Sequence, residues 1–357
     1  MNRSVVWPAL AVILATPVAA YGVPASPIAS ATAGAGNAIA GREGAGGRSS
    51  ATRELLAVDP SSPTDPQPIG DAASGEDVLG SIPALVAANE AELPAPPEVD
   101  GRRLALAKEI LAESYKDYTW PESRSVEMAA DVRRRNPKIP PRIVDATLEV
   151  FKASLRPAVM EARVAQQLAV RLDEETLRAG LDWERSDLGR RVRTAWNLAE
   201  GPGQRADMKA YVEQHMRKGA MTDDVRARAC AQIVALTDLA DGMVSMFGSM
   251  AGAFIVGAAV AEGKPLDMMS LGKALGDVRG VLRMVTREGA VISCLFAFRE
   301  VEDGELDRWL DFLRSDAGGR YARGKTAAEA DVFNERGGIM FRTMLQLAPR
   351  LRPSGTA

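Results

Sequence analysis

Few side chains in this sequence are of the kinds that most often catalyse reactions or bind transition metals. There is one histidine, His215, and there are two cysteines, Cys230 and Cys294, in 357 residues. A zinc site with several histidines, a HExxH motif and a Cys-rich metal site are excluded, because each needs more of these ligands. We therefore expect no metal and no cofactor.

The two cysteines allow two interpretations. In an oxidising compartment Cys230 and Cys294 could form a disulfide, which would join two helices and reduce the entropy of the unfolded chain. Cys294 also lies in the apolar stretch Val291–Phe298, where a buried free thiol is equally typical. The sequence leaves both interpretations open.

Acidic residues occur as pairs at expected helix starts. Glu174 and Glu175 form one such pair, and Glu302 and Asp303 form another. The positive end of a helix dipole favours acids there without any catalytic role. A hydrolase would need carboxylates that converge between helices with perturbed pKa values, so we predict no catalytic residue and regard an exported hydrolase as the least favoured function.

The elements that carry these residues are predicted to be helices. From residue 101 onward apolar side chains recur at helical spacing, as with Leu104, Ala107 and Leu111, and strand-like alternation is nowhere sustained. The sequence predicts an all-α fold, in which two related helical units, residues 101–200 and 222–347, form a bundle-like domain.

An internal repeat is the basis for the two units. Sixteen residues from Leu177 to Val192 align with Leu306 to Tyr321 at an offset of 129 positions, and eight of the sixteen are identical. A weaker similarity lies upstream, between segments that begin at Arg103 and Arg226. The positions that define the motif are Leu177, Leu181, Trp183, Ser186, Asp187 and Gly189 in the first copy, and Leu306, Leu310, Phe312, Ser315, Asp316 and Gly318 in the second.

This motif predicts a helix, a tight break and a second helix. The leucines and aromatic residues would face a core, and each serine would cap the second helix by accepting a hydrogen bond from a free backbone N–H. Each aspartate would lie in the first turn, and each glycine would allow close approach of the helices. The motif is interpreted as structural, with no catalytic or ligand-binding role.

The same residues resemble the bacterial exported family called domain of unknown function 2059. Its "EL…FY.S..G" core is similar to Glu305-Leu306 followed by Phe312, Ser315 and Gly318, and its upstream "LALA.E.L" helix is similar to Leu104–Leu111. Aspartate replaces the proline that often follows the serine in the family. The resemblance implies an exported helical protein and assigns no catalytic or ligand residue.

The N-terminus has the pattern of a secretory signal peptide. Met1–Ala20 contains Arg3, then an apolar run that is too short to span a membrane, then small residues at the cleavage positions. We expect cleavage after Ala20 and a periplasmic or secreted protein. Residues 21–100 are rich in Ala, Gly, Pro and Ser and predict a disordered linker.

Gly242–Ala261 is a run of twenty uncharged residues. Its length suits a membrane span and Gly248 and Gly252 have GxxxG spacing, but its many small residues make it only marginally apolar. A buried central helix is the favoured interpretation. A helix that inserts into a membrane or self-associates is the alternative.

These patterns predict a protein that binds or belongs to the cell envelope rather than an enzyme. The 44 basic and 47 acidic residues give a net charge of −3, which does not favour nucleic-acid binding. The partner is unknown from the sequence; another envelope protein or a second copy is a candidate, and membrane contact is a less favoured one. The sequence identifies neither the ligand nor the pathway.

Overall fold

The structure is a computed structural model, and every regular element that it describes is a helix, as the sequence predicts. It describes residues 75–114, 139–200, 225–261 and 286–351, with single residues and short stretches between 118 and 137, between 204 and 214, and at 272 and 276. The predicted signal peptide Met1–Ala20, His215 and most of the predicted linker lie outside the described residues.

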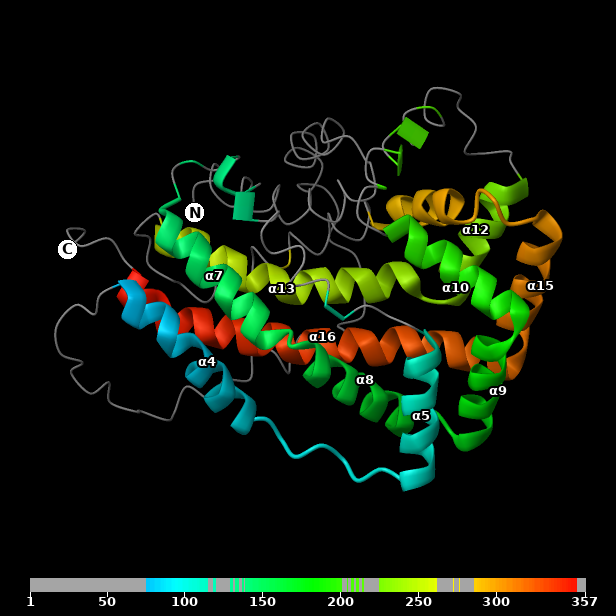
Figure 1. Ribbon diagram of the computed structural model, residues 1–357, viewed down its shortest axis with the longest axis horizontal. Helices are drawn as coiled ribbons and strands as arrows, with labels where there is room; N and C mark the ends of the chain where they lie inside the picture. Colours follow the sequence, from blue (N-terminus) through cyan, green and yellow to red (C-terminus); the bar gives the residue numbers. More distant parts are fainter. Residues whose placement is uncertain are drawn as a thin grey trace, which may run out of the picture.

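The main helices follow the chain from the blue to the red end of Figure 1. They are α4 (Gly75–Ala91), α5 (Gly101–Ser114), α7 (Pro141–Ser154), α8 (Pro157–Arg171), α9 (Glu174–Arg185), α10 (Asp187–Glu200), α12 (Val225–Leu236), α13 (Leu239–Ala261), α15 (Asp303–Arg314) and α16 (Asp316–Leu351). A further helix covers residues 286–297.

Helices α13 and α16 lie side by side along the long axis of the molecule (Figure 1). Small residues bring their backbones together: a Cβ atom on Gly337 of α16 would lie 2.7 Å from the Cβ of Ser249 on α13. Ser249 also donates a hydrogen bond to the carbonyl of Phe333 on α16, at 3.1 Å. The glycines and serines of α13 therefore serve packing within the molecule.

The apolar run Gly242–Ala261 is part of α13. Among the described helices, α13 is the one long and apolar enough to cross a membrane, with a mean hydropathy of 1.8 over its most apolar window. Because 72% of that window is buried inside the molecule, the packing agrees with the favoured interpretation of a buried central helix.

The predicted linker over residues 21–100 extends too far toward the C-terminus. Residues 75–91 form α4, which packs on α7 and α16. Val78, Ile82 and Val86 are buried, because their four-residue spacing places them on one face of the helix. The linker prediction rests on the composition of residues 21–100 as a whole, within which Val78–Ala88 is expected to form at most a transient helix.

The two predicted units, 101–200 and 222–347, do not form two separate cores. One apolar core contains side chains of α5, α8 and α9 together with α13 and most of α16. The other contains α12, residues 290–298 and α15 together with α10. Helix α10 thus packs in the core of α12 and α15, whereas α13 and α16 of the predicted second unit pack together in the core of the first unit's helices. The helix after each predicted break lies in a different core from the helix before it.

Candidate functional site at the two hinges

The first hinge lies between α9 and α10 at Ser186, whose backbone is extended (φ −67°, ψ 155°). The hydroxyl of Ser186 donates to the carbonyl of Trp183 at 2.7 Å and accepts a hydrogen bond from the backbone N–H of Gly189 at 2.9 Å. One side chain thus satisfies a carbonyl of the helix that ends and an N–H of the helix that begins.

The second hinge, between α15 and α16, has the same arrangement at Ser315 (φ −64°, ψ 151°). Its hydroxyl donates to the carbonyl of Phe312 at 2.7 Å and accepts from the N–H of Gly318 at 3.1 Å. The extended serine redirects the chain, and α10 and α16 each lie in a different core from the helix that precedes them.

Both hinges need a glycine three residues after the serine. A Cβ atom on Gly189 would lie 2.0 Å from the carbonyl oxygen of Trp183, and one on Gly318 would lie 2.0 Å from the carbonyl oxygen of Phe312. Each contact is with backbone, which cannot move aside as a flexible side chain would. The predicted role of these glycines in close approach of the helices therefore has a specific steric cause.

The hinges meet through their aromatic residues. Trp183 and Phe312 stack with ring centroids 4.4 Å apart and planes 8° apart. Around this stack the four motif leucines are buried in the two cores. Leu177 and Leu181 belong to the first core, and Leu306 and Leu310 belong to the second.

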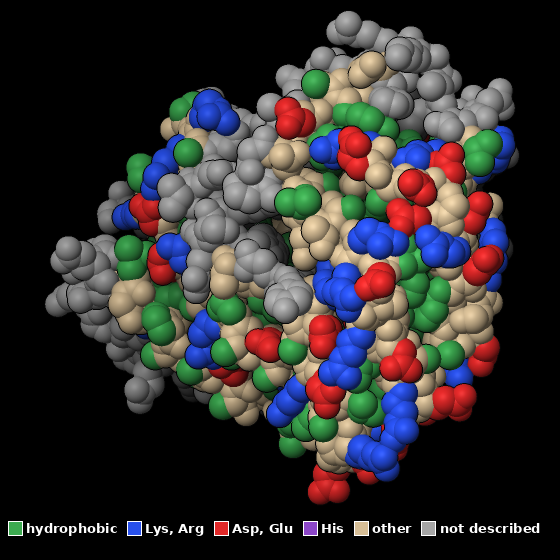
Figure 2. Space-filling model, turned by 45° about the vertical axis from the view of Figure 1, so that its right-hand side comes forward, with side chains coloured by type: hydrophobic (Ala, Val, Ile, Leu, Met, Phe, Trp, Pro, Cys, Tyr) green, Lys and Arg blue, Asp and Glu red, His purple; other side chains and the backbone are tan. Residues whose placement is uncertain are grey.

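Ion pairs join the two hinge regions, with one arginine after each hinge contacting a carboxylate at the start of the helix before the other. Arg191, after the first hinge, pairs with Glu305 of α15, and Arg320, after the second, pairs with Asp173 at the start of α9 at 3.1 Å. Asp173 caps α9 by accepting from the N–H of Thr176, and this backbone hydrogen bond lowers the pKa of its carboxyl. On the face that Figure 2 shows, basic and acidic side chains alternate.

The two motif aspartates lie at the surface. The side chains of Asp187 and Asp316 are 82% and 86% exposed, and they pair with Arg190 and Arg320 of the same helices. First-turn positions give them a favourable interaction with the helix dipole, and their exposure makes the contribution small.

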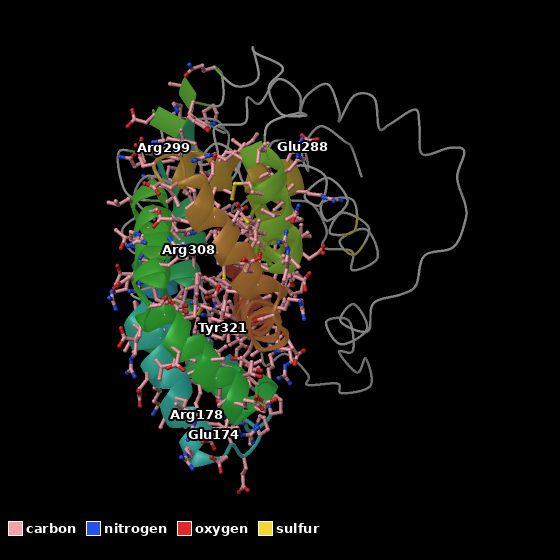
Figure 3. All side chains as sticks on the ribbon, turned by 90° about the vertical axis from the view of Figure 1, so that its right-hand side faces the viewer. Glu174, Arg178, Glu288, Arg299, Arg308 and Tyr321 are labelled. Carbon is pink, nitrogen blue, oxygen red and sulfur yellow. A yellow bond between two sulfur atoms is a disulfide. The ribbon has the colours of Figure 1, made fainter. Side chains whose placement is uncertain are left out.

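A buried charged cluster lies directly behind the first hinge. Glu184 is 5% exposed and accepts hydrogen bonds from the hydroxyl of Tyr321 and from Nζ of Lys325, both at 2.7 Å. Arg193 donates to its second oxygen at 3.1 Å, and Lys325 also donates to the hydroxyl of Ser114. Figure 3, which looks onto this end of the molecule, shows Tyr321 between Arg178 of α9 and Arg308 of α15.

The cluster shifts the pKa values of Glu184 and Tyr321 in opposite directions. Burial acts to raise the pKa of Glu184, but the hydrogen bonds and charges of Lys325, Tyr321 and Arg193 outweigh it and hold that pKa below its ordinary value. Burial, assisted by the Glu184 charge, raises the pKa of Tyr321 well above its ordinary value. A general acid or base must exchange a proton near neutral pH, which suits neither group.

Sequence reasoning missed Glu184, Tyr321 and Lys325. The available signal was a difference between the aligned repeats, because Glu184 occupies the position that Leu313 has in the second copy. Each of the three residues is ordinary on a helix surface. Only the crossing of α16 into the first core brings them together.

The cysteines form a disulfide between α12 and the helix over residues 286–297. Both Cys230 and Cys294 are fully buried, and their Cα atoms are 5.7 Å apart. Of the two interpretations that the sequence left open, the structure contains the disulfide rather than two buried free thiols. In the described residues, no group of three or more His, Cys, Asp or Glu side chains could hold a metal ion.

Comparison with known proteins gives no relative for this arrangement. No family model matches the chain, and no curated protein or solved structure matches it.

Proposed function

We propose that this chain is an exported, all-helical protein that acts by binding in the cell envelope rather than by catalysis. The observation that carries the proposal is the buried disulfide between Cys230 and Cys294. Disulfides form and persist in oxidising compartments, where a signal peptide at Met1–Ala20 would deliver the chain.

A binding role is supported by the state of the charged groups at the hinges. Glu184 is the most buried carboxylate there, and three donors from α10 and α16 occupy it. Arg191 and Arg320 each form an ion pair with a carboxylate at the start of the helix before the other hinge. These paired groups hold helices in register, and none of them is set up as an activated nucleophile or base.

We further propose that the two hinges derive from one duplicated unit. The matching backbone angles at Ser186 and Ser315 and the matching glycine contacts support a common origin. Membership of the family called domain of unknown function 2059 stays a prediction from the motif residues.

Cell fractionation combined with thiol trapping tests the proposed function. The full chain with a C-terminal tag would be expressed in a bacterium with two membranes, and a variant that lacks residues 2–20 would serve as the control. We expect the full chain in the periplasm, cut after Ala20 and with both thiols protected from alkylation. The control should stay in the cytoplasm with thiols that react after unfolding. Full-length chain in the cytoplasm with reactive thiols would refute export.

Association with a membrane through α13 is the second candidate, favoured by the length and hydropathy of that helix. Alkaline carbonate extraction separates the two candidates. A protein that packs α13 inside its own core is released into the supernatant, whereas one that inserts α13 stays in the pellet.

A further inference from the structure

Helix α4 packs across α7 and α16 as a separate element at the N-terminal end of the described chain (Figure 1). Its buried residues Val78, Ile82 and Val86 are 4%, 0% and 2% exposed. They lie one helical turn apart and form a single apolar ridge, as an amphipathic helix does when it binds in a groove.

The C-terminal end of α4 makes specific polar contacts with α16. Asn89 is 1% exposed, and its side-chain amide donates to the hydroxyl of Thr343 and to Oε1 of Gln346, both at 3.0 Å. Thr343 is itself fully buried. These contacts fix both the position and the direction of α4, because an apolar side chain in place of Asn89 would leave polar groups unsatisfied.

Glu90 supplies the counter-charge for a cation inside the core. Arg336 of α16 is 2% exposed, donates from Nε to the carbonyl of Ser154 at 2.9 Å and pairs with Glu90. Arg156 donates to the same carboxylate at 2.6 Å. Without α4, Glu335 is the carboxylate that remains beside Arg336 in the described part of the chain, and its oxygen is 3.9 Å away. The groove therefore favours an acidic residue at this position of its occupant.

The chain around α4 allows it to be exchanged. Residues 92–100 form a connection without regular structure that contains Pro94, Pro96 and Pro97; it is mostly exposed, and Leu93 and Val99 are the residues of it that pack on the core. Fully extended, this connection spans about 30 Å. Helix α4 also contains Gly80 and Pro83, which weaken a helix, so that its order depends on the groove.

We propose that the groove between α7 and α16 is a helix-binding site, that α4 is its ligand within the chain, and that α4 of a second copy can occupy it in trans. The second copy is the partner that matches, because it presents the same apolar ridge followed by Asn89 and Glu90. Exchange of α4 then produces a dimer without any new kind of contact.

A synthetic peptide of residues 75–91 with a fluorescent label tests the groove. The receptor is the purified full chain with Ile82→Asp, which weakens its own α4 and leaves the groove unchanged, and Val86→Ala is a milder second receptor. We expect the peptide to bind Ile82→Asp most tightly and the wild-type chain least, since the wild-type α4 competes. Control peptides with Ile82→Asp or Glu90→Gln should bind at least tenfold more weakly.

Exchange between copies is tested by size-exclusion chromatography with light scattering. Wild-type chain refolded at high concentration from mild denaturant should contain a slowly dissociating dimer, and Ile82→Asp should not. The proposal is overturned if folded receptors bind the wild-type and control peptides equally. It is also overturned if the wild-type chain stays monomeric.

Discussion

The two hinges share their backbone but differ in what lies behind them. At the first hinge Glu184 is surrounded by Tyr321, Lys325 and Arg193. The aligned residue at the second hinge is Leu313, and the positions that align with the three partners are occupied by Val192, Trp196 and Ala322. Leu313 and Val192 are buried there, and Trp196 packs on Phe298 with ring centroids 5.8 Å apart.

The two units also differ in covalent cross-linking, which is found in the second unit. Cys230 and Cys294 join two helices of the second unit. In the upstream alignment Cys230 matches Ala107, and at the repeat offset of 129 Cys294 matches Ala165. Both alanines are buried in the first core, where α5 packs on α8. One unit is held by ionic hydrogen bonds and the other by a covalent bond and aromatic packing.

This comparison separates what the hinge requires from what it tolerates. The serine and glycine are the same at both hinges because the backbone turn itself needs them. The interior behind the turn accepts either a satisfied polar cluster or an apolar one, since each leaves few unpaired groups.

The largest expected effect is loss of the disulfide. Replacing both cysteines with alanine should lower the free energy of unfolding by about 4 kcal/mol, since the bond closes a loop with a sequence separation of 64 residues. Urea unfolding of the double variant against wild type measures the difference. A difference below about 1 kcal/mol would contradict a stabilising cross-link.

Introducing a disulfide at the matching positions of the first unit tests whether the two units are equivalent. If the alignment is correct, Ala107→Cys with Ala165→Cys should form a second disulfide, which mass spectrometry after alkylation would detect. Failure of this pair to oxidise in a folded chain would break the proposed equivalence of the two units.

Glu184→Gln should destabilise the fold by about 3 kcal/mol, because Lys325 and Arg193 would lose their buried counter-charge. The folded pKa of Glu184 is lowered, so its contribution is present at neutral pH and is lost as the pH falls through that pKa. Unfolding free energies measured against pH should therefore differ less between wild type and variant in acid. A constant difference would exclude the ionised carboxylate as the cause.

Gly189→Ala and Gly318→Ala should each cost about 2 kcal/mol, because the added methyl group meets a backbone carbonyl. Gly304→Ala is the matched control, since a Cβ there meets no atom within 4 Å, and it should be neutral or stabilising. Thermal unfolding of the three variants provides the test. Equal midpoints would remove the steric explanation.

The smallest predicted effect is at the serines. Ser186→Ala and Ser315→Ala should each cost on the order of 1 kcal/mol, since each removes the hydrogen bond that caps the second helix together with the one to the preceding carbonyl. The two costs should be similar if the hinges are equivalent. An unchanged melting midpoint in either variant would contradict the capping role of that serine.

The sequence by itself determined the local structure. Helical spacing gave the all-α class, and Ser186 and Ser315 were expected as caps because a hydroxyl near a free N–H acts within one turn of the chain. The long uncharged run Gly242–Ala261 indicated a central helix, and its many glycines and alanines favoured burial. In each case the responsible interactions connect residues close in sequence, or depend only on composition.

The tertiary structure alone decided which helices share a core. Nothing local in α10 or α16 specifies that each lies in a different core from the helix before it, because an amphipathic face fits many apolar surfaces equally well. The same holds for Glu90 and Glu184. Their partners Arg336 and Lys325 are 246 and 141 residues away in sequence, and only the assembled core removes these charges from water and pairs them.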